Sequence, residues 1–311
     1  MRFPSLGQAL AAVPCNAPRK APAFYRGSVP LAGRGSYDPG VIPPCVKSWA
    51  LCDPRSLRGV RGILTDIDDT LTSDGVIPLG AVAALAALRE AAVPVIAVTG
   101  RPMGWSRDIA AQTPLAAIVA ENGAVAVFAD ALVERGVRIE YADDTATRGA
   151  NAVRLHAVAA RIVAEVLGAT LARDSPGRVT DIAIDHGEFA HLDAARIAQV
   201  VALMQGEGMQ ATVSSIHVNG WFGTHSKLTG AAWVVRRLFG RNLDAERGEW
   251  LYVGDSTNDE LMFAAFPLSV GVANLADFAD RLQQWPAFIT EHDRGRGFVE
   301  VAQAVLAARG A

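Results

Sequence analysis

The 311-residue sequence predicts an α/β fold, in which a three-layer core with a parallel sheet carries a smaller, inserted α+β domain. Short apolar runs such as residues 95–98 recur along the chain, with amphipathic helical stretches between them. This pattern is typical of parallel strands that are covered by helices on both faces. Between residues 130 and 220 the strands instead alternate polar and apolar residues, which predicts a separate domain with half-exposed antiparallel strands.

The composition places the chain among globular proteins. Half of the residues are hydrophobic, a fifth are charged, and the formal net charge is −3. Neither the charge balance nor the distribution of charge indicates a nucleic-acid or membrane partner, and no apolar run reaches the about 18 residues of a membrane span. The N-terminal residues lack the continuous apolar core of a secretory signal, so we expect a cytoplasmic location. The sequence predicts no oligomeric state.

The cysteines and the first 58 residues carry no recognisable chemistry. Cys15, Cys45 and Cys52 are odd in number and irregularly spaced, so we expect neither a disulfide framework nor a zinc site. Residues 1–58 are rich in Pro, Gly and Arg and show no sustained helical or strand period. We therefore predict a poorly ordered extension, with a partner-binding role left open, and place the start of the folded core at residue 59.

A cluster of carboxylates follows the first predicted strand of the core. Ile63 and Leu64 indicate a buried strand, and Asp66, Asp68 and Asp69 come directly after it. Like charges in a partly buried site are costly, so such a cluster usually binds a cation or performs acid–base chemistry. A solvated acidic turn would show the same pattern, and the rest of the chain distinguishes the two interpretations.

The next strand ends in residues suited to phosphate binding. A helix that begins after Pro78 leads to the strand at 95–98, which ends in Thr99 and Gly100. The right-handed crossover of a βαβ unit makes the two strands parallel, so Asp66 and Thr99 should meet at the edge of the sheet where ligands bind. The Thr99 hydroxyl and the Gly100 amide suit phosphoryl oxygens, although a Thr-Gly pair is also ordinary turn chemistry.

The chain then enters the predicted inserted domain. A third strand at 117–120 ends in Glu121-Asn122-Gly123, and the alternation over 124–128 predicts a hairpin that leaves the sheet. We expect helices at 151–167 and 193–206, and strands at 179–185 and 210–218. Polar side chains on these strands face either a ligand or water; the candidate substrate-contacting residues are Arg178, Asp181, His217 and Asn219.

The core resumes at residue 221 with a lysine and a second acidic turn. Lys227 lies in the first turn of a predicted helix, where the helix dipole disfavours a cation, so its position suggests a nearby anion. The predicted strand at 250–254 ends in Asp255, and Asp259 opens the helix that follows. Two further strands are expected at 268–272 and 287–289.

Four segments together resemble the motifs of the haloacid dehalogenase superfamily phosphatases. They are, in order, Asp66-Ile-Asp68-Asp69-Thr70, Thr99-Gly100-Arg101, Lys227, and Gly254-Asp255-Ser-Thr-Asn258-Asp259. Glu121-Asn-Gly-Ala124 is similar to a signature of subclass IIB, the Cof-type and sucrose-phosphatase-like branch that carries a large α/β cap. The resemblance covers about residues 60–311. It implies a Rossmann-like core at 59–129 and 221–311 and a cap at 130–220 that determines substrate specificity.

The resemblance also implies an activity. Asp66 would be the nucleophile and form an aspartyl phosphate, and Asp68 would be the general acid and base. Mg²⁺ would bind the Asp66 and Asp255 carboxylates and the Asp68 carbonyl, with Asp259 in its outer shell. Thr99, Gly100, Lys227 and Asn258 would hold the phosphoryl group of a small sugar phosphate or similar metabolite.

Two departures from the family pattern and two alternative functions remain. Asp69 stands where many members have glycine, and its role is unassigned; Ser256 stands where a second glycine is frequent. A phosphomutase of the phosphomannomutase type would use the same nucleophile, and a catalytically idle, ligand-binding protein would share the fold. The identity of the phosphorylated substrate is not predicted.

Overall fold

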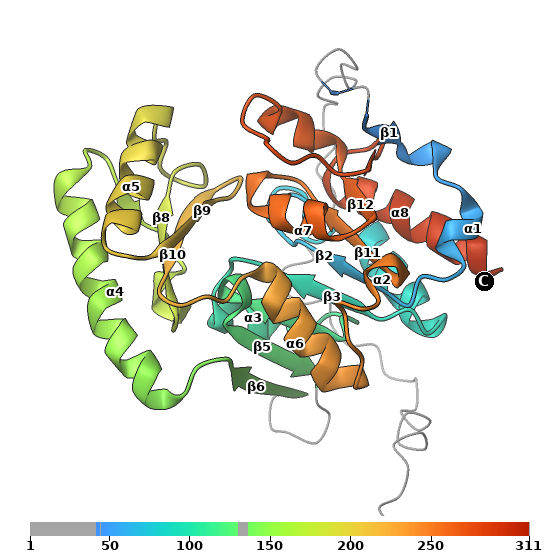
Figure 1. Ribbon diagram of the computed structural model, residues 1–311, viewed down its shortest axis with the longest axis horizontal. Helices are drawn as coiled ribbons and strands as arrows, with labels where there is room; N and C mark the ends of the chain where they lie inside the picture. The colour runs from blue at the N-terminus through green and yellow to red at the C-terminus, as the bar shows by residue number, and fades with distance from the viewer. Residues whose placement is uncertain (1–41, 44, 130–135, 311) are drawn as a thin grey trace, which may run out of the picture.

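The computed structural model describes residues 42–43, 45–129 and 136–310, and its largest feature is a nine-stranded sheet (Figure 1). Its strands lie in the order β1-β13-β12-β11-β2-β3-β4-β5-β6. Neighbouring strands from β1 across to β4 are parallel, whereas β5 is antiparallel to both β4 and β6. The strands are β1 (Lys47–Ser48), β2 (Gly62–Thr65), β3 (Val95–Val98), β4 (Ala117–Ala120), β5 (Val125–Ala129), β6 (Val137–Tyr141), β11 (Trp250–Gly254), β12 (Leu268–Gly271) and β13 (Phe288–Ile289).

Helices cover both faces of this sheet and make it the middle of three layers. The helices that pack in the apolar cluster on one face are α1 (Pro54–Leu57), α2 (Leu79–Glu90), α3 (Met103–Ala110) and α8 (Arg294–Arg309). The helices on the other face are α6 (Lys227–Phe239) and α7 (Glu260–Ala265). Strands β2, β3, β4 and β11 are buried along their whole length, as expected for parallel strands with two covered faces. The predicted α/β fold class with a parallel sheet core is therefore confirmed.

A second, four-stranded sheet lies beside the first, in the order β7-β8-β10-β9, with all of its pairs antiparallel. Its elements are α4 (Thr145–Glu165), β7 (Thr170–Leu171), β8 (Asp181–Asp185), α5 (Ala194–Gly206), β9 (Gln210–Val213) and β10 (His217–Trp221). Figure 1 shows α4 and α5 on the outer side of this sheet, and the three elements share one apolar core. Aspartate side chains at 144 and 193 cap the two helices, which explains where each begins. Among the described residues, none of the helices combines the length and apolar character that crossing a bilayer demands.

The predicted poorly ordered segment does not extend to residue 58. Residues 1–41 lie outside the described residues, but residues 45–58 do not form a poorly ordered leader. Strand β1 pairs with β13, and Asp53 caps α1. Trp49 is buried and makes an edge-to-face contact with Phe288, with ring centroids 5.6 Å apart. A strand of two residues has no detectable period, which is why the pattern of the sequence did not reveal it.

The described boundaries of the insert also differ from the prediction. The predicted start at residue 130 lies outside the described residues, yet β6 pairs with β5 in the large sheet, so the insert begins after Tyr141. The hairpin predicted from residues 124–128 therefore extends the sheet and does not leave it. The strand predicted at 210–218 is two strands, β9 and β10, which turn at Ser214, whose N–H donates to the His217 carbonyl.

Two glycines bring the turn after β4 against the start of α6. The turn is a short 3-10 helix, η3 (Glu121–Gly123), in which all three residues have positive φ. A Cβ on Gly123 would overlap the Ser226 carbonyl oxygen, and a Cβ on Gly230 would lie 2.5 Å from the Gly123 Cα. This close backbone approach fixes the first turn of α6, which begins with Lys227, relative to the end of β4.

We expect Gly230→Ala to lower the free energy of unfolding by about 1–3 kcal/mol, because overpacking against rigid backbone outweighs the helix propensity of alanine. Gly149→Ala in α4 is the matched control, since a Cβ there meets nothing within 4 Å. It should stabilise the protein by about 0.5–1 kcal/mol. Urea unfolding of both variants measures the difference. Equal stabilisation by the two substitutions would contradict the packing argument.

Candidate active site

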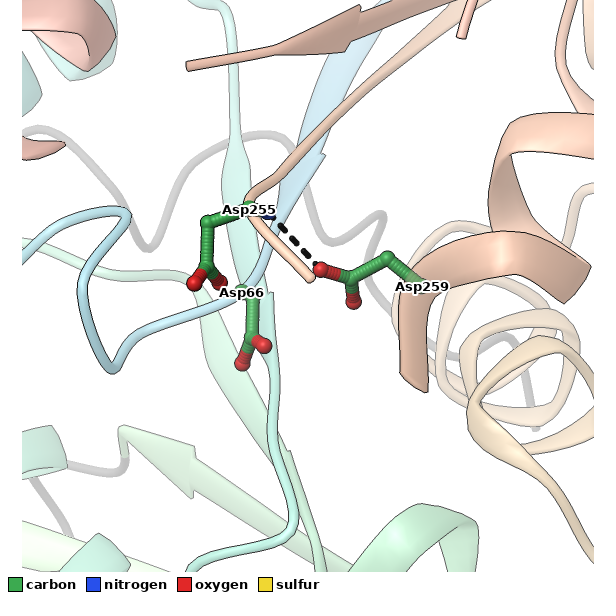
Figure 2. Close-up of side chains that lie close together, drawn as sticks. All are labelled: Asp66, Asp255 and Asp259. Atoms are coloured by element: carbon green, nitrogen blue, oxygen red, sulfur yellow. Dashed lines mark hydrogen bonds between the residues drawn. The ribbon is translucent and has the colours of Figure 1, made fainter. Parts of the chain in front are cut away.

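The acidic residues that follow β2 and β11 meet at the carboxyl edge of the large sheet (Figure 2). Asp66 follows β2, Asp255 follows the adjacent strand β11, and Asp259 ends the short 3-10 helix η7 (Thr257–Asp259). All three residues are buried, and a carboxylate oxygen of each lies within 4.8 Å of the others. The topology therefore concentrates negative charge at the edge where open α/β sheets bind ligands.

Lys227 is the cation at the centre of this cluster. Its Nζ donates to Asp66 Oδ2 at 2.8 Å, to Asp259 Oδ1 at 2.7 Å and to Asn258 Oδ1 at 3.1 Å. A capping box formed by Ser226 and Thr229 starts α6, which places the lysine in the first turn as predicted. Burial by itself would lower the pKa of Lys227, but the carboxylates of Asp259 and Asp66 outweigh it and raise that pKa. The lysine is therefore charged at neutral pH.

One lysine does not neutralise three carboxylates. Burial raises the pKa of Asp66 to about 7; Lys227 opposes this rise, and Asp259 adds to it. Burial, together with Asp259 and Asp66, also raises the pKa of Asp255 well above its ordinary value. Without a further cation, burial thus disfavours the ionised form of both carboxyls.

The donor set fits a divalent cation with oxygen ligands. Asp255 Oδ1 accepts from the Thr70 hydroxyl at 3.1 Å, but its Oδ2 is buried without a hydrogen-bond partner. Both oxygens of Asp259, by contrast, already accept protein donors. Its Oδ1 accepts from Lys227 and Tyr252, and its Oδ2 accepts from two backbone N–H groups. Each Asp66 oxygen accepts a single donor, from Ile67 or Lys227, whereas each Asp259 oxygen accepts two. Asp66 and Asp255 can thus offer direct ligands, and Asp259 orients the groups around them. Carboxylates in this arrangement suit Mg²⁺.

A cleft above the acidic cluster brings core and insert residues together. The predicted core residues that line it are Asp66, Asp68, Thr99, Gly100 and Asn258. His217 and Asn219 line it from β10, and Ser214 and Ser215 line it from the turn between β9 and β10. Arg101 completes the lining, so every side chain around the cleft is polar or charged.

Two of the four residues predicted to contact substrate lie elsewhere. The side chains of Arg178 and Asp181 are buried at the junction between the insert and the core, and neither residue lines the cleft. The Arg178 guanidinium donates to both Asp181 oxygens at 2.9 Å and to the Gly100 carbonyl at 2.8 Å. Asn219 Nδ2 donates to the same carbonyl at 3.3 Å. These contacts join the insert to the turn after β3, so we assign Arg178 and Asp181 to that junction.

Asp69, the residue without an assigned role, is bonded to α8 and to its own loop. Its carboxylate forms an ion pair with Arg294, 3.1 Å from the Nε atom, and its N–H donates to the Thr72 hydroxyl. Its φ of 52° lies in the left-handed region, which explains why glycine suits this position. Asp69 is thus a partner of α8 and is not among the acidic residues of the candidate metal site.

The pattern of the sequence missed two charged residues at this edge. Glu121 is fully buried, and its carboxylate accepts from the N–H groups of Met103, Val179 and Thr180. It therefore ties the end of β4 to the insert. Arg101 follows Thr99 and Gly100 and pairs with Asp68. The sequence offered one indication of both residues: each comes just after a predicted strand, at the same edge of the sheet as Asp66.

Comparisons with known proteins agree with the motifs. Residues 63–140 match the model of a family described as haloacid dehalogenase-like hydrolase, while a search of the curated proteins finds no match. A solved structure from Thermoplasma acidophilum is 15% identical, with a TM-score of 0.60, and covers 79% of this chain and 98% of that one. Sucrose-phosphatase from Synechocystis sp. PCC6803, solved with sucrose and phosphate, is 16% identical, with a TM-score of 0.55 and the same coverage. A sugar phosphatase of haloacid dehalogenase subclass IIB is 14% identical, with a TM-score of 0.53, and covers 78% of this chain and 98% of that one. The predicted resemblance is therefore confirmed at the level of family motif and fold.

We expect Mg²⁺ to stabilise the protein more strongly at pH 8 than at pH 6. The raised pKa of Asp66 means that the folded, metal-free protein binds more protons than the unfolded chain between about pH 4 and 7, so its stability falls as pH rises through that window. Below about pH 7 the cation must also displace a proton. At a Mg²⁺ concentration about 100 times the Kd, the gain should approach about 2.7 kcal/mol.

Thermal unfolding with and without Mg²⁺ at both pH values measures this effect. Asp255→Asn should abolish the gain, and Asp280→Asn, at an exposed side chain, should preserve it. An equal gain in wild type and Asp255→Asn would exclude Asp255 as a ligand.

Proposed function

We propose that this chain, which has the haloacid dehalogenase-like fold and matches that family over residues 63–140, is a Mg²⁺-dependent phosphomonoester hydrolase. Its substrate in this proposal is a sugar phosphate or a similarly small phosphorylated metabolite. One observation carries the proposal: Asp66 lies beneath a polar cleft, bonded to a buried lysine and beside a carboxylate oxygen of Asp255 that lacks a partner.

Asp66 is the nucleophile in this reaction. One of its carboxylate oxygens attacks the phosphorus in line with the leaving oxygen, the bond to that oxygen breaks, and an aspartyl phosphate forms. The backbone N–H of Ile67 donates to Asp66 Oδ1 at 2.7 Å and Lys227 donates to Oδ2, so the carboxylate is held in one orientation. Lys227 also offsets the repulsion between the carboxylate and the phosphoryl group.

Asp68 supplies the proton transfers. It lies two residues after Asp66, lines the same cleft and is only partly buried. As a general acid it protonates the leaving alkoxide, and as a general base it then takes a proton from the water that hydrolyses the aspartyl phosphate. The two steps return both aspartates to their starting states, and the net products are an alcohol and inorganic phosphate.

The remaining cleft residues hold the two parts of the substrate. In this proposal the Thr99 hydroxyl, the Gly100 amide, Asn258 and Lys227 bind the transferring phosphoryl group; the first three residues line the cleft, and Lys227 donates to Asn258. Mg²⁺, held by Asp66, Asp255 and the Asp68 carbonyl, would supply further charge neutralisation. Ser214, Ser215, His217 and Asn219 approach from the insert, and their hydroxyl, imidazole and amide groups suit a hydroxylated leaving group.

Two solved structures with this fold support the choice of substrate class. One is named a sucrose-phosphatase and was solved with sucrose and phosphate, and the other is named a sugar phosphatase. The fully polar lining of the cleft agrees with a sugar and disfavours an apolar leaving group.

We expect Asp66→Asn to abolish phosphate release, with a loss of about 10⁴-fold or more in kcat, because the amide is a far weaker nucleophile. The variant should keep its fold, which circular dichroism and urea unfolding check. Asp280→Asn, at an exposed side chain, serves as the control and should keep wild-type turnover. Wild-type rates in Asp66→Asn would refute the nucleophile assignment.

Incubation with a panel of hexose phosphates should yield free phosphate in the presence of Mg²⁺ and none in EDTA. Phosphate release reports hydrolysis, and chromatography of the sugar products reports any transfer from the 1-position to the 6-position. A phosphomutase would produce the isomeric hexose phosphate with no free phosphate. Release of phosphate at the full rate in metal-free buffer would exclude the role of the metal.

A further inference from the structure

The guanidinium of Arg101 is surrounded by three carboxylates from separate segments. Its Nε lies 2.9 Å from Asp68 Oδ2, and its Nη2 donates to Asp68 Oδ1, also at 2.9 Å. The same Nη2 donates to Glu188 Oε1 at 3.1 Å, and Nη1 donates to Asp174 Oδ2 at 3.1 Å. The Arg101 side chain is only 9% exposed, so these bonds are largely shielded from water.

The three carboxylates come from both sides of the cleft. Asp68 belongs to the loop after β2 in the core, whereas Asp174 and Glu188 belong to the insert, on either side of β8. Arg101 itself follows β3, and the ring of Trp105 lies 5.4 Å from its guanidinium carbon. Arg101 is therefore the cation through which the insert and the proposed acid–base residue contact each other.

The insert holds its two carboxylates firmly. Asp185 accepts the N–H groups of residues 187–190 and so fixes the turn that carries Glu188. His217 Nε2 lies 3.0 Å from Glu188 Oε2, and this contact, with Arg101, lowers the pKa of Glu188 to about 2. Asp174 also pairs with the buried Arg178, which contacts the Gly100 carbonyl. Arg101 consequently meets anchored partners on the insert side.

This arrangement determines the orientation of Asp68. Both of its oxygens accept from one planar guanidinium, and such a two-point contact fixes the plane of the carboxylate as well as its position. The guanidinium is in turn oriented by Glu188 and Asp174. Arg101 thus links Asp68 directly to two carboxylates of the insert.

We propose that Arg101 is a positioning residue that couples docking of the insert to the orientation of Asp68, with Glu188 as its partner on the insert. The inference rests on the proposed phosphatase function and adds a role to residues that this function leaves unused. In this proposal the insert encloses the substrate, and its acidic residues also orient Asp68, which protonates the leaving oxygen.

The first test compares two aryl phosphates of similar size. A poor leaving group such as phenolate needs protonation, whereas p-nitrophenolate scarcely does, so loss of Asp68 alignment should slow the two reactions unequally. We expect Arg101→Lys to reduce kcat/KM, which covers only the steps up to release of the phenol, about 100-fold for phenyl phosphate and less than about fivefold for p-nitrophenyl phosphate. Asp68→Asn should show the same selectivity. Arg107→Lys on α3, the helix that follows Arg101, should change neither value, since the Arg107 side chain pairs with the exposed Asp108.

The second test is a double-mutant cycle on the substrate that the wild type hydrolyses fastest, whether an aryl or a sugar phosphate. Glu188→Gln should lower kcat about tenfold in the wild type but less than about twofold in Arg101→Lys, because Glu188 acts through Arg101. Glu207→Gln, in an exposed ion pair of the insert, is the matched control. Conservative variants are used because truncating Arg101 would leave three carboxylates without their cation.

The outcomes separate this inference from the proposed function. Equal losses of kcat/KM with the two aryl phosphates, or the same loss of kcat from Glu188→Gln in both backgrounds, would overturn the positioning role while leaving the phosphatase intact. If the wild type releases phosphate from none of the phosphomonoesters, the proposed function itself fails. Thermal unfolding of each variant confirms that the rates compare folded proteins.

Discussion

The buried ion pairs of Lys227 with Asp66 and Asp259 are the interactions on which the candidate site depends. Carboxylates carried by two adjacent strands can meet at one edge only if their repulsion and the cost of desolvation are offset. The lysine provides this charge, and its position is determined by the start of its own helix and by the packing of that helix against the turn after β4. A capping box starts α6, and the contact between Gly123 and Gly230 holds that helix against the end of β4. The backbone packing of the core is thus directly connected to the electrostatics of the site.

The insert is joined to the core at the same edge, through the turns that carry the motif residues. The Gly100 carbonyl accepts from Arg178 and Asn219, and the Glu121 carboxylate accepts from the backbone N–H groups of the two residues directly before β8. Burial raises the pKa of Asp181 to about 7 although Arg178 and Asn219 lower it, which reflects how fully this junction excludes water. The segments that would bind the phosphoryl group therefore also position the residues that would contact the leaving group.

Much of the core could be predicted because its strands are continuous apolar runs with both faces covered. The strands at 95–98, 117–120 and 250–254 agree with the structure for this reason. The two-residue strand β1 and the edge strand β6 could not be recognised in this way, since neither has a long apolar run and both depend on pairing with a neighbour. The turn at Ser214 was likewise hidden within one alternating segment, because alternation continues on both sides of it.

The sequence by itself determined the chemical groups of the site and their order: aspartates, a threonine and a lysine, each placed where a predicted strand ends or a predicted helix begins. Parallel β/α topology alone is enough to bring such positions to one edge. Only the tertiary structure decided which polar residues of the insert reach the cleft, because their direction depends on how two sheets dock. It placed His217 and Asn219 in the cleft, left Arg178 and Asp181 in the junction, and put Arg101 between Asp68 and Glu188. The contact from Asn219 to the Gly100 carbonyl, for example, joins residues 119 positions apart, and no local period encodes a contact over that distance.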